Sequence, residues 1–183
     1  MTEADPAAVD APSAAAPSGA PRWWRERSDA IAAALSLELT PLHAEQSAYQ
    51  RIEVFEHAQF GRLLVLDGYI QASQADEFIY HEMALHVPLL GRVRREASVL
   101  IVGGGDGGAL REALVHDFVT AVTMVEIDAA VIAASNRWLG VQGDYDDPRV
   151  RLVIGDAADF VGAACAAGET YDVILLDLTE PVG

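Results

Sequence analysis

Cysteine and long apolar runs are both scarce in this sequence. A single cysteine, Cys165, occurs among 183 residues, so no disulfide can form within the chain, and a reducing compartment fits. No segment approaches the roughly 18 uninterrupted apolar residues of a membrane-spanning helix. The N-terminus has acidic residues where a signal peptide needs basic ones, and it lacks a continuous apolar stretch. We therefore expect a soluble, cytoplasmic protein without a membrane partner.

Basic residues are also few. Twelve Lys and Arg residues stand against 28 Asp and Glu residues, which leaves a formal net charge of -16. This balance argues against nucleic acid or an anionic membrane surface as a partner, and it favours cationic ligands. Solubility alone explains an acidic composition equally well.

The first part of the chain combines a tail with strand signals. Residues 1–22 are rich in Ala and Pro and predict a disordered tail. Residues 23–88 predict a small antiparallel β domain and a linking helix that stops near Pro88, with turns at Gly61 and at Asp67-Gly68. The strand signals are LSLELT, SAYQRIEVFEH and GRLLVLDGYIQAS, and the helix is ADEFIYHEMALHVPLL.

Residues 89–183 change to apolar runs that alternate with helical stretches. Runs that are apolar throughout suit strands covered on both faces, and helical connections between them suit parallel pairing. The class is therefore α/β, with a Rossmann-like doubly wound parallel sheet of the kind that S-adenosylmethionine-dependent methyltransferases have. Gly140 and Gly168 are expected C-caps. The strands are ASVLIVGG, AVTMVEID, VRLVIGD and YDVILLD, and the helices are GALREALVHDF, AAVIAASNRWLG and AADFVGAACAAG.

A carboxylate closes or follows each of the four predicted parallel strands. The first strand opens onto glycines in G-x-G-x-x-G register, Gly103, Gly105 and Gly108, with Asp106 among them. The second strand ends at Glu126, placed where an acidic side chain can accept both ribose hydroxyls of a nucleotide. Because ligands bind beyond the carboxyl ends of parallel strands, we expect one acidic edge. Its members are Asp106, Glu126, Asp156 and Asp177.

Asp106 narrows the choice of ligand. Two unit charges about 4 Å apart interact by roughly 4 kcal/mol at an effective dielectric near 20. Facing a pyrophosphate, Asp106 would be repelled, whereas facing an ammonium group it would be an anchor. The ligand is therefore expected to carry adenosine at one end and positive charge at the other, which disfavours a dehydrogenase.

From about Ser47 to Gly183 the chain resembles the spermidine synthases, or polyamine aminopropyltransferases. The resemblance rests on an ordered set of motifs: SAYQ, LVLDGYIQ, DEFIYHEM, VLIVGGGDGG, VEID, DDPRVRLVIGDA and YDVILLDLTEP. It implies transfer of an aminopropyl group from decarboxylated S-adenosylmethionine, as co-substrate, to a polyamine acceptor such as putrescine. The products are then spermidine and 5'-methylthioadenosine, and no tightly bound cofactor is implied. It also implies a homodimer or homotetramer.

The resemblance assigns a role to each matching residue. Asp106 would hold the ammonium end of the aminopropyl group, where a carboxylate would also repel ordinary S-adenosylmethionine. Asp177 would be the catalytic carboxylate, with Tyr80 beside it. Of the remaining positions, Gln50, Gln71 and Gly103 would contact the nucleoside donor, Glu126 its ribose, and Asp156 with Ala157 its adenine, while His81, Tyr80, Asp177 and Glu180 would line the amine channel.

The chemistry of the acceptor supports a carboxylate base. A primary amine with a pKa near the lysine value of about 10.4 is mostly protonated at pH 7, and unmasking it costs roughly 4–5 kcal/mol. Asp177 at a strand end could take that proton and orient the nitrogen. No metal is needed, and His81 and His86, five positions apart, lack neighbouring ligands in the sequence.

Two departures from the family pattern bear on function. Glu180 stands where the family usually has aspartate, which favours a shifted acceptor preference. Family members also continue beyond the DLTEP motif through further strands and helices, so we expect this chain to lack the C-terminal part and to expose an edge strand. Two further readings stay open: a methyltransferase, which would bind S-adenosylmethionine itself at least as well, and a noncatalytic polyamine or nucleoside binding module.

Overall fold

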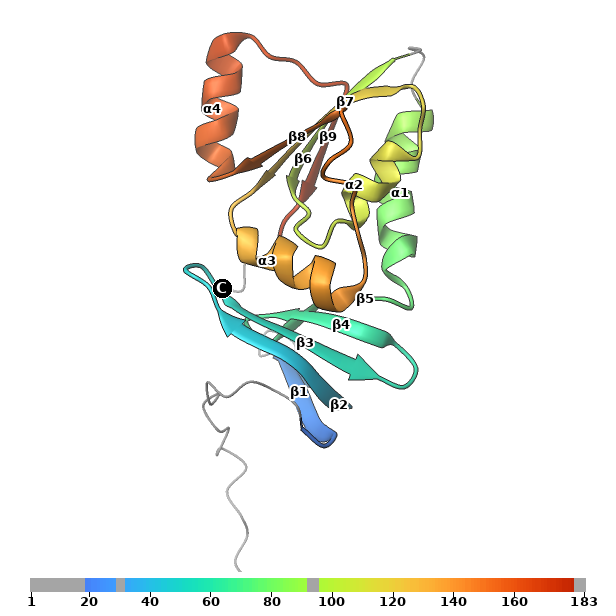
Figure 1. The fold of residues 1–183 in the computed structure, drawn as a ribbon, viewed down its shortest axis with the longest axis vertical. Coiled ribbons are helices and arrows are strands. Elements are labelled where there is room, and N and C mark those ends of the chain that lie inside the picture. The colour runs from blue at the N-terminus through green and yellow to red at the C-terminus, as the bar shows by residue number, and fades with distance from the viewer. Residues whose placement is uncertain (1–18, 29–31, 92–95, 180–183) are drawn as a thin grey trace, which may run out of the picture.

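The computed structural model describes residues 19–28, 32–91 and 96–179. Most of the expected tail and Glu180 therefore lie outside the described residues. The described part contains two sheets, an antiparallel one and a parallel one (Figure 1). No helix in this part is both long and apolar enough to cross a membrane.

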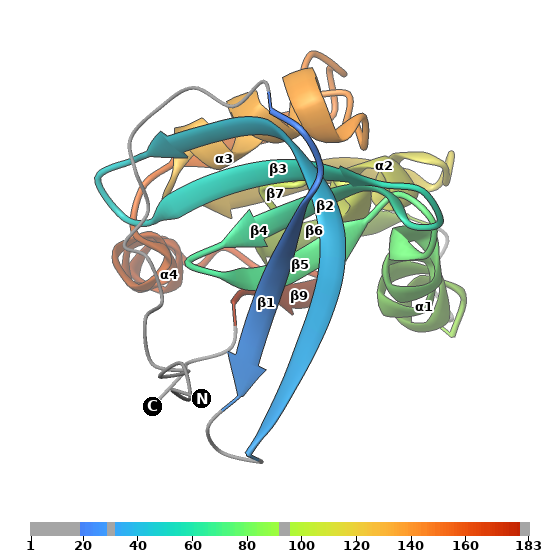
Figure 2. The same cartoon turned by 90° about the horizontal axis from the view of Figure 1, so that it is seen from below.

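Five antiparallel strands form the first sheet, in chain order. Strands β3 and β4 are buried on both faces because Ile52 and Leu64 pack on one side and Phe55 and Leu63 on the other. Figure 2 shows β1 and the paired part of β2 extending beyond the rest of this sheet. The strands are β1 (Arg22–Ser28), β2 (Ala33–Gln46), β3 (Arg51–His57), β4 (Gly61–Leu66) and β5 (Tyr69–Ser73).

The turns explain where this sheet departs from the prediction. Asp67 and Gly68 join β4 to β5 with φ of 49° and 83°, so the predicted turn is confirmed. The expected strand over residues 47–57 is too long, because the Ser47 N–H donates to the Gln50 carbonyl and closes a turn before β3 begins. Strand β1 was not predicted from the sequence; its Trp23 is 74% exposed and lies outside the core.

The second sheet is parallel, with strand order β8-β7-β6-β9 (Figure 1). Its central strand β6 pairs with β7 and β9, so the carboxyl ends of the strands meet at one edge. The elements are α1 (Glu77–Leu90), β6 (Ala97–Gly103), α2 (Gly108–Leu114), β7 (Val119–Glu126), α3 (Ala129–Ala134) running into a π-helical turn η2 (Ser135–Leu139), β8 (Val150–Ile154), α4 (Ala157–Ala167) and β9 (Val173–Asp177).

Helices cover both faces of the parallel sheet, as the doubly wound class requires. Helices α1 and α2 pack on one face, where Leu85 and Leu110 meet Ile101 and Met124. Helix α4 lies over the other face, where Phe160 meets Leu100. Helix α3 lies between the two sheets (Figure 1) and packs on β3 and β4. The α/β class and the Rossmann-like core therefore agree with the sequence analysis.

The helix ends follow the sequence signals with two differences. Gly140 and Gly168 adopt φ of 80° and 72°, as expected of glycine C-caps. Helix α1 continues past Pro88 to Leu90, because proline removes only one backbone donor and the Gly91 N–H still bonds to the Val87 carbonyl. Helix α2 ends at Leu114, four residues before the predicted end.

Strand β9 lies at the edge of the parallel sheet. Within the described residues it pairs only with β6. Its residues Ile174 and Leu176 lie on the same face of the sheet as α4, but they are 59% and 66% exposed. Among the described residues, β9 is therefore an edge strand, as expected from the sequence.

Candidate active site

A cavity of about 880 Å³ lies between the antiparallel sheet and the carboxyl ends of the parallel strands. Three of the four predicted strand-end carboxylates, Asp106, Glu126 and Asp177, line it. Asp67, Asp76 and Glu77 also line it, whereas His81 is the only basic side chain among the described lining residues. The cavity is therefore strongly acidic.

Asp106 occupies the place where a phosphate would bind in a nucleotide site. Its Oδ1 accepts the backbone N–H of Gly108 at 2.8 Å, the first residue of α2. The donor that a helix N-terminus usually offers to an anion is thus already bonded to a carboxylate. This contact supports the expectation that the glycine-rich turn does not bind pyrophosphate.

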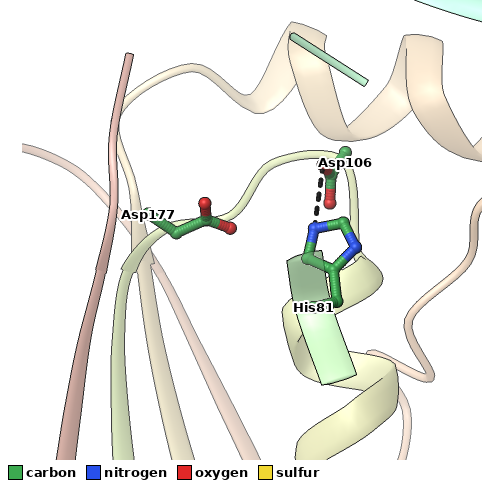
Figure 3. A group of neighbouring side chains, drawn as sticks. All are labelled: His81, Asp106 and Asp177. Carbon is green, nitrogen blue, oxygen red and sulfur yellow. Dashed lines mark ion pairs between the residues drawn. The ribbon is translucent and has the colours of Figure 1, made fainter. Parts of the chain in front are cut away.

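His81 links Asp106 to helix α1 (Figure 3). Its Nε2 lies 3.3 Å from Asp106 Oδ2 and its Nδ1 lies 2.6 Å from Glu77 Oε2. Burial by itself lowers the pKa of His81, but the hydrogen bond and charge of Asp106, the Glu77 hydrogen bond and the charge of Asp177 raise it to about 9. Gly108 leaves room for the ring, because a β-carbon there would collide with the His81 imidazole.

Asp177 ends β9 beside the first glycine of the turn. The Tyr80 hydroxyl donates to its Oδ1 at 2.8 Å, whereas its Oδ2 is buried and has no partner in the described structure. Burial, and then the charge of Asp106, raise the pKa of Asp177 above its ordinary value. Gly103 has a φ of 85°, and a β-carbon there would collide with the Asp177 carbonyl oxygen.

Asp106 stays ionised although it is largely buried. Burial opposes its charge, but the hydrogen bond and charge of His81 and the Gly108 N–H outweigh burial and lower the pKa of Asp106. Asp106 and Asp177 therefore differ: one carboxylate is stabilised as an anion, and the other is shifted towards accepting a proton.

Glu126 ends β7 and is fixed by the backbone that follows it. Its Oε1 accepts the Asp128 N–H at 2.9 Å, and the residue is 7% exposed. Burial is the main cause that raises the pKa of Glu126. Its position on the cavity wall suits the expected ribose contact.

Asp128 joins the two sheets behind Glu126. Its side chain caps α3 by accepting the Ala130 N–H. It also accepts the Ser47 hydroxyl at 2.6 Å and the Gln50 side-chain amide at 3.1 Å. Gln50 lines the cavity, and its hydrogen bond to Asp128 restrains its side chain there.

Some of the other predicted site residues line the cavity and some do not. Gln71 lines the cavity from β5 and is exposed, and its amide donates to the Tyr69 carbonyl. Asp156 and Ala157 are not among the lining residues; Asp156 accepts the Ala158 N–H and caps α4. Their adenine contact stays a prediction, as does the role of Glu180, which lies outside the described residues.

Two acidic residues at the start of α1 shape the site and were not predicted as site residues. Glu77, the first residue of α1, is buried against His81 and Arg111. Asp76 precedes α1 but makes no side-chain cap bond; it lines the cavity and accepts the Ser73 hydroxyl. Their place in the DEFIYHEM motif was the available signal.

Three ligand-type side chains come within metal-binding distance of each other. One donor atom from each of His81, Asp106 and Asp177 lies within 4.8 Å of the others. Both ring nitrogens of His81 face carboxylates, however, so both must carry protons for the contacts to be favourable. A doubly protonated ring has no lone pair for a metal, and the group suits an organic cation better.

The fold and the cavity define a class: a Rossmann-like α/β protein with an acidic cavity at the carboxyl ends of its parallel strands. A family model described as the spermine/spermidine synthase domain matches residues 77–183, and one described as the spermidine synthase tetramerisation domain matches residues 22–74. The chain belongs to the spermine/spermidine synthase family.

Individual relatives agree with this assignment. Polyamine aminopropyltransferases from Escherichia fergusonii and from Escherichia coli K12 are each 47% identical over 144 residues, which cover 78% of this chain and 49% of theirs. The chain therefore spans about half the length of the curated relatives that it matches.

Solved structures give the same result. A spermidine synthase in complex with the transition-state analogue AdoDATO has a TM-score of 0.80 and 37% identity, covering 88% of this chain and 56% of that one. The spermidine synthase from Thermotoga maritima has a TM-score of 0.78 and 36% identity, covering 86% and 56%.

Proposed function

We propose that the cavity binds decarboxylated S-adenosylmethionine and a polyamine, and that it transfers the aminopropyl group between them. The products are spermidine, when putrescine is the acceptor, and 5'-methylthioadenosine. The observation that carries the proposal is the unpartnered Oδ2 of Asp177, buried in a cavity that Asp106 also lines. A buried carboxylate oxygen without a donor is costly unless a ligand supplies one, and a protonated amine is such a ligand.

The donor is bound by shape at one end and by charge at the other. Glu126 accepts the ribose hydroxyls, and Gln50 and Gln71 face the nucleoside from the antiparallel sheet. Asp106 holds the ammonium of the aminopropyl group. In this proposal, the carbon next to sulfur lies between Asp106 and Asp177.

The transfer is a displacement at that carbon. Asp177, which Tyr80 orients, removes a proton from the acceptor ammonium, and the freed nitrogen attacks the carbon. The carbon–sulfur bond breaks, and its electron pair returns to the sulfonium, which leaves as a neutral thioether. The raised pKa of Asp177 assists the step, because a more basic carboxylate takes the amine proton at a lower cost.

Self-association is part of the proposal. Residues 22–74 match a tetramerisation domain, and Figure 1 shows β1 of the β1–β2 hairpin on the side of the antiparallel sheet away from the parallel sheet. We propose that this hairpin mediates a homodimer or homotetramer.

Product analysis of the 183-residue chain tests the proposed reaction. The chain is incubated with decarboxylated S-adenosylmethionine and a mixture of diamines and triamines, and mass spectrometry follows methylthioadenosine and aminopropylated amines. We expect both products, and we expect Asp177→Asn to lower turnover by about a hundredfold or more, the range of a general base. Asp146→Asn, the same change in an exposed loop, should leave turnover unchanged.

Other outcomes identify the alternatives. Binding of the donor without either product would indicate a noncatalytic binding module. Tighter binding of ordinary S-adenosylmethionine, with a methylated product, would indicate a methyltransferase. Ordinary putrescine preference would remove the shifted-acceptor hypothesis that Glu180 motivated.

A further inference from the structure

We infer that Glu77 is a positioning residue. It keeps the His81 ring doubly protonated, with one carboxylate at each ring nitrogen, and it thereby orients the Asp106 carboxylate towards the cationic end of the donor. The inference rests on the proposed function, because it assigns that cation to Asp106. It adds a residue of helix α1 that does not touch the ligand's reacting atoms.

The geometry around His81 requires two ring protons. Nδ1 lies 2.6 Å from a Glu77 oxygen, and Nε2 lies 3.3 Å from an Asp106 oxygen. A neutral imidazole has one N–H, so one of these contacts would place a nitrogen lone pair against a carboxylate lone pair. With only 2% of the His81 side chain exposed, water has little room to relieve that repulsion.

Glu77 is itself paired with a cation from the neighbouring helix. It lies one helical turn before His81, and the Arg111 guanidinium from α2 donates to the same Oε2 at 3.0 Å. Arg111 also bonds to Glu112 through its Nε at 2.7 Å, which restrains its position. The order Arg111, Glu77, His81, Asp106 alternates in charge from the back of α2 to the cavity wall.

The other groups around the ring agree with this charge state. Asp177 on β9 adds a nearby negative charge, and Tyr80 on α1 contacts the ring edge, with centroids 5.2 Å apart. At the N-terminus of α2, Gly108 lies against the ring and donates its N–H to Asp106. The raised pKa of His81, about 9, is consistent with a ring that stays charged at neutral pH.

Loss of the Glu77 charge should affect binding of the ammonium end of the donor only. Gly108 fixes Oδ1 of Asp106 and His81 fixes Oδ2, so the remaining lone pairs point in set directions. Without the charge of Glu77, the ring loses a proton near neutral pH and the second restraint on Asp106 weakens. Binding of the ammonium end should then weaken, while binding of the nucleoside end is unaffected.

The test uses the 183-residue chain and Glu77→Gln, which keeps the size of the side chain and removes its charge. First, NMR of the histidine ring carbons follows the titration of His81; Glu77→Gln should lower its midpoint by at least one pH unit. Second, calorimetry compares decarboxylated S-adenosylmethionine with 5'-methylthioadenosine at pH 7.5. We expect affinity for the first to fall about tenfold and affinity for the second to stay within twofold.

A pH profile separates positioning from a merely structural role. In Glu77→Gln, affinity for the decarboxylated donor should fall as pH rises from 6 to 8, whereas the unchanged chain should bind it evenly over this range. Glu82→Gln, the same change on the exposed face of α1, is the matched control and should behave like the unchanged chain. Arg111→Gln should alter His81 in the same direction by a smaller amount, and it replaces Glu77→Gln if the latter does not fold.

Two results would overturn the inference. One is an ordinary His81 midpoint, near 6.5, in the unchanged chain. The other is Glu77→Gln, or Arg111→Gln in its place, with an unshifted His81 and unchanged donor affinity. By contrast, a chain whose His81 titrates high but which binds neither nucleoside would refute the proposed function and leave the pairing of Glu77 with His81 intact.

Discussion

At Asp106, charge recognition can be separated from shape by one substitution. Asp106→Asn keeps an oxygen for the Gly108 N–H but removes the negative charge. The attraction between unit charges at about 4 Å is roughly 4 kcal/mol at an effective dielectric near 20. Because Asn also perturbs the contact with His81, we expect a smaller net effect, a loss of about ten- to a hundredfold in affinity for the decarboxylated donor.

Ordinary S-adenosylmethionine is the comparison ligand for this variant. Its carboxylate is repelled by Asp106, so its affinity should stay level or rise in Asp106→Asn. The preference between the two donors, measured by calorimetry, should therefore narrow. If both affinities stay the same, Asp106 does not face the aminopropyl end.

His81 gives the stability of the chain a defined dependence on pH. Its folded-state pKa of about 9 lies above the ordinary value of 6.5. The charged ring therefore stabilises the fold fully below pH 6.5, and this contribution is lost as pH rises through 9. A shift of this size corresponds to on the order of 3 kcal/mol.

Urea unfolding at pH 6, 7.5 and 9.5 measures this dependence, with His81→Gln as the reference. The free energy of unfolding of the unchanged chain should approach that of His81→Gln as pH rises, because the ring loses its charge only in the unchanged chain. Parallel curves for the two proteins over this window would show that the pKa of His81 is the same in the folded and unfolded states.

Between elements, the contact of Asp128 with Ser47 and Gln50 connects the two sheets. Asp128 and Asp156 each cap a helix through the N–H two residues on, but only Asp128 also reaches the antiparallel sheet. Losing a cap costs about 1 kcal/mol, and leaving buried donors unpaired adds about 1–3 kcal/mol. Because Ser47 and Gln50 are only part-buried, we expect Asp128→Ala to lower the free energy of unfolding by about 2 kcal/mol in total and Asp156→Ala by about 1 kcal/mol.

Chemical denaturation of both variants checks this difference. Asp128→Ala should also weaken binding of 5'-methylthioadenosine, because the Asp128 carboxylate holds the Gln50 side chain at the cavity wall. Equal destabilisation by the two substitutions would mean that the contact between the sheets contributes nothing beyond the cap.

The elements that the sequence predicts best are those that a local pattern of apolar residues and glycines defines. Four apolar runs and a glycine turn were enough to predict the parallel strands, and the topology of such sheets brings Asp106, Glu126 and Asp177 to one edge. Strand β1 was not predicted because its two adjacent tryptophans break the alternation of apolar and polar residues, and one of them is exposed. Asp156 shows the limit of the strand-end rule, since its side chain turns to cap α4 instead of lining the cavity.

The groups behind the cavity were harder to predict because they depend on contacts between helix faces. Glu77 and Asp76 have the composition of a helix start, and capping is the usual role of acidic residues there. Only the packing of α1 against α2 places Arg111 next to Glu77. Side chains that meet through tertiary packing have no spacing in the sequence that identifies them.

The molecule as a whole is a strongly acidic body with an acidic cavity. Its net charge is -16, and all of its basic side chains other than histidine are arginines. Among the described lining residues of the cavity, six are Asp or Glu and one is His. The field of the whole surface and the charge of the cavity therefore attract the same ligands, which are cations.

Because the surface and the cavity are both acidic, salt should slow the association of a cationic nucleoside more than that of a neutral one. Decarboxylated S-adenosylmethionine is cationic, whereas 5'-methylthioadenosine is neutral. The Debye length shortens from about 30 Å at 0.01 M ionic strength to about 8 Å at 0.15 M, so the long-range attraction is mostly screened at the higher value. We expect the association rate of the cationic donor to fall about tenfold over this range, and that of methylthioadenosine to change less than twofold. Stopped-flow binding measures both rates, and an equal response of the two nucleosides would mean that their entry is governed by the shape of the cavity and not by its charge.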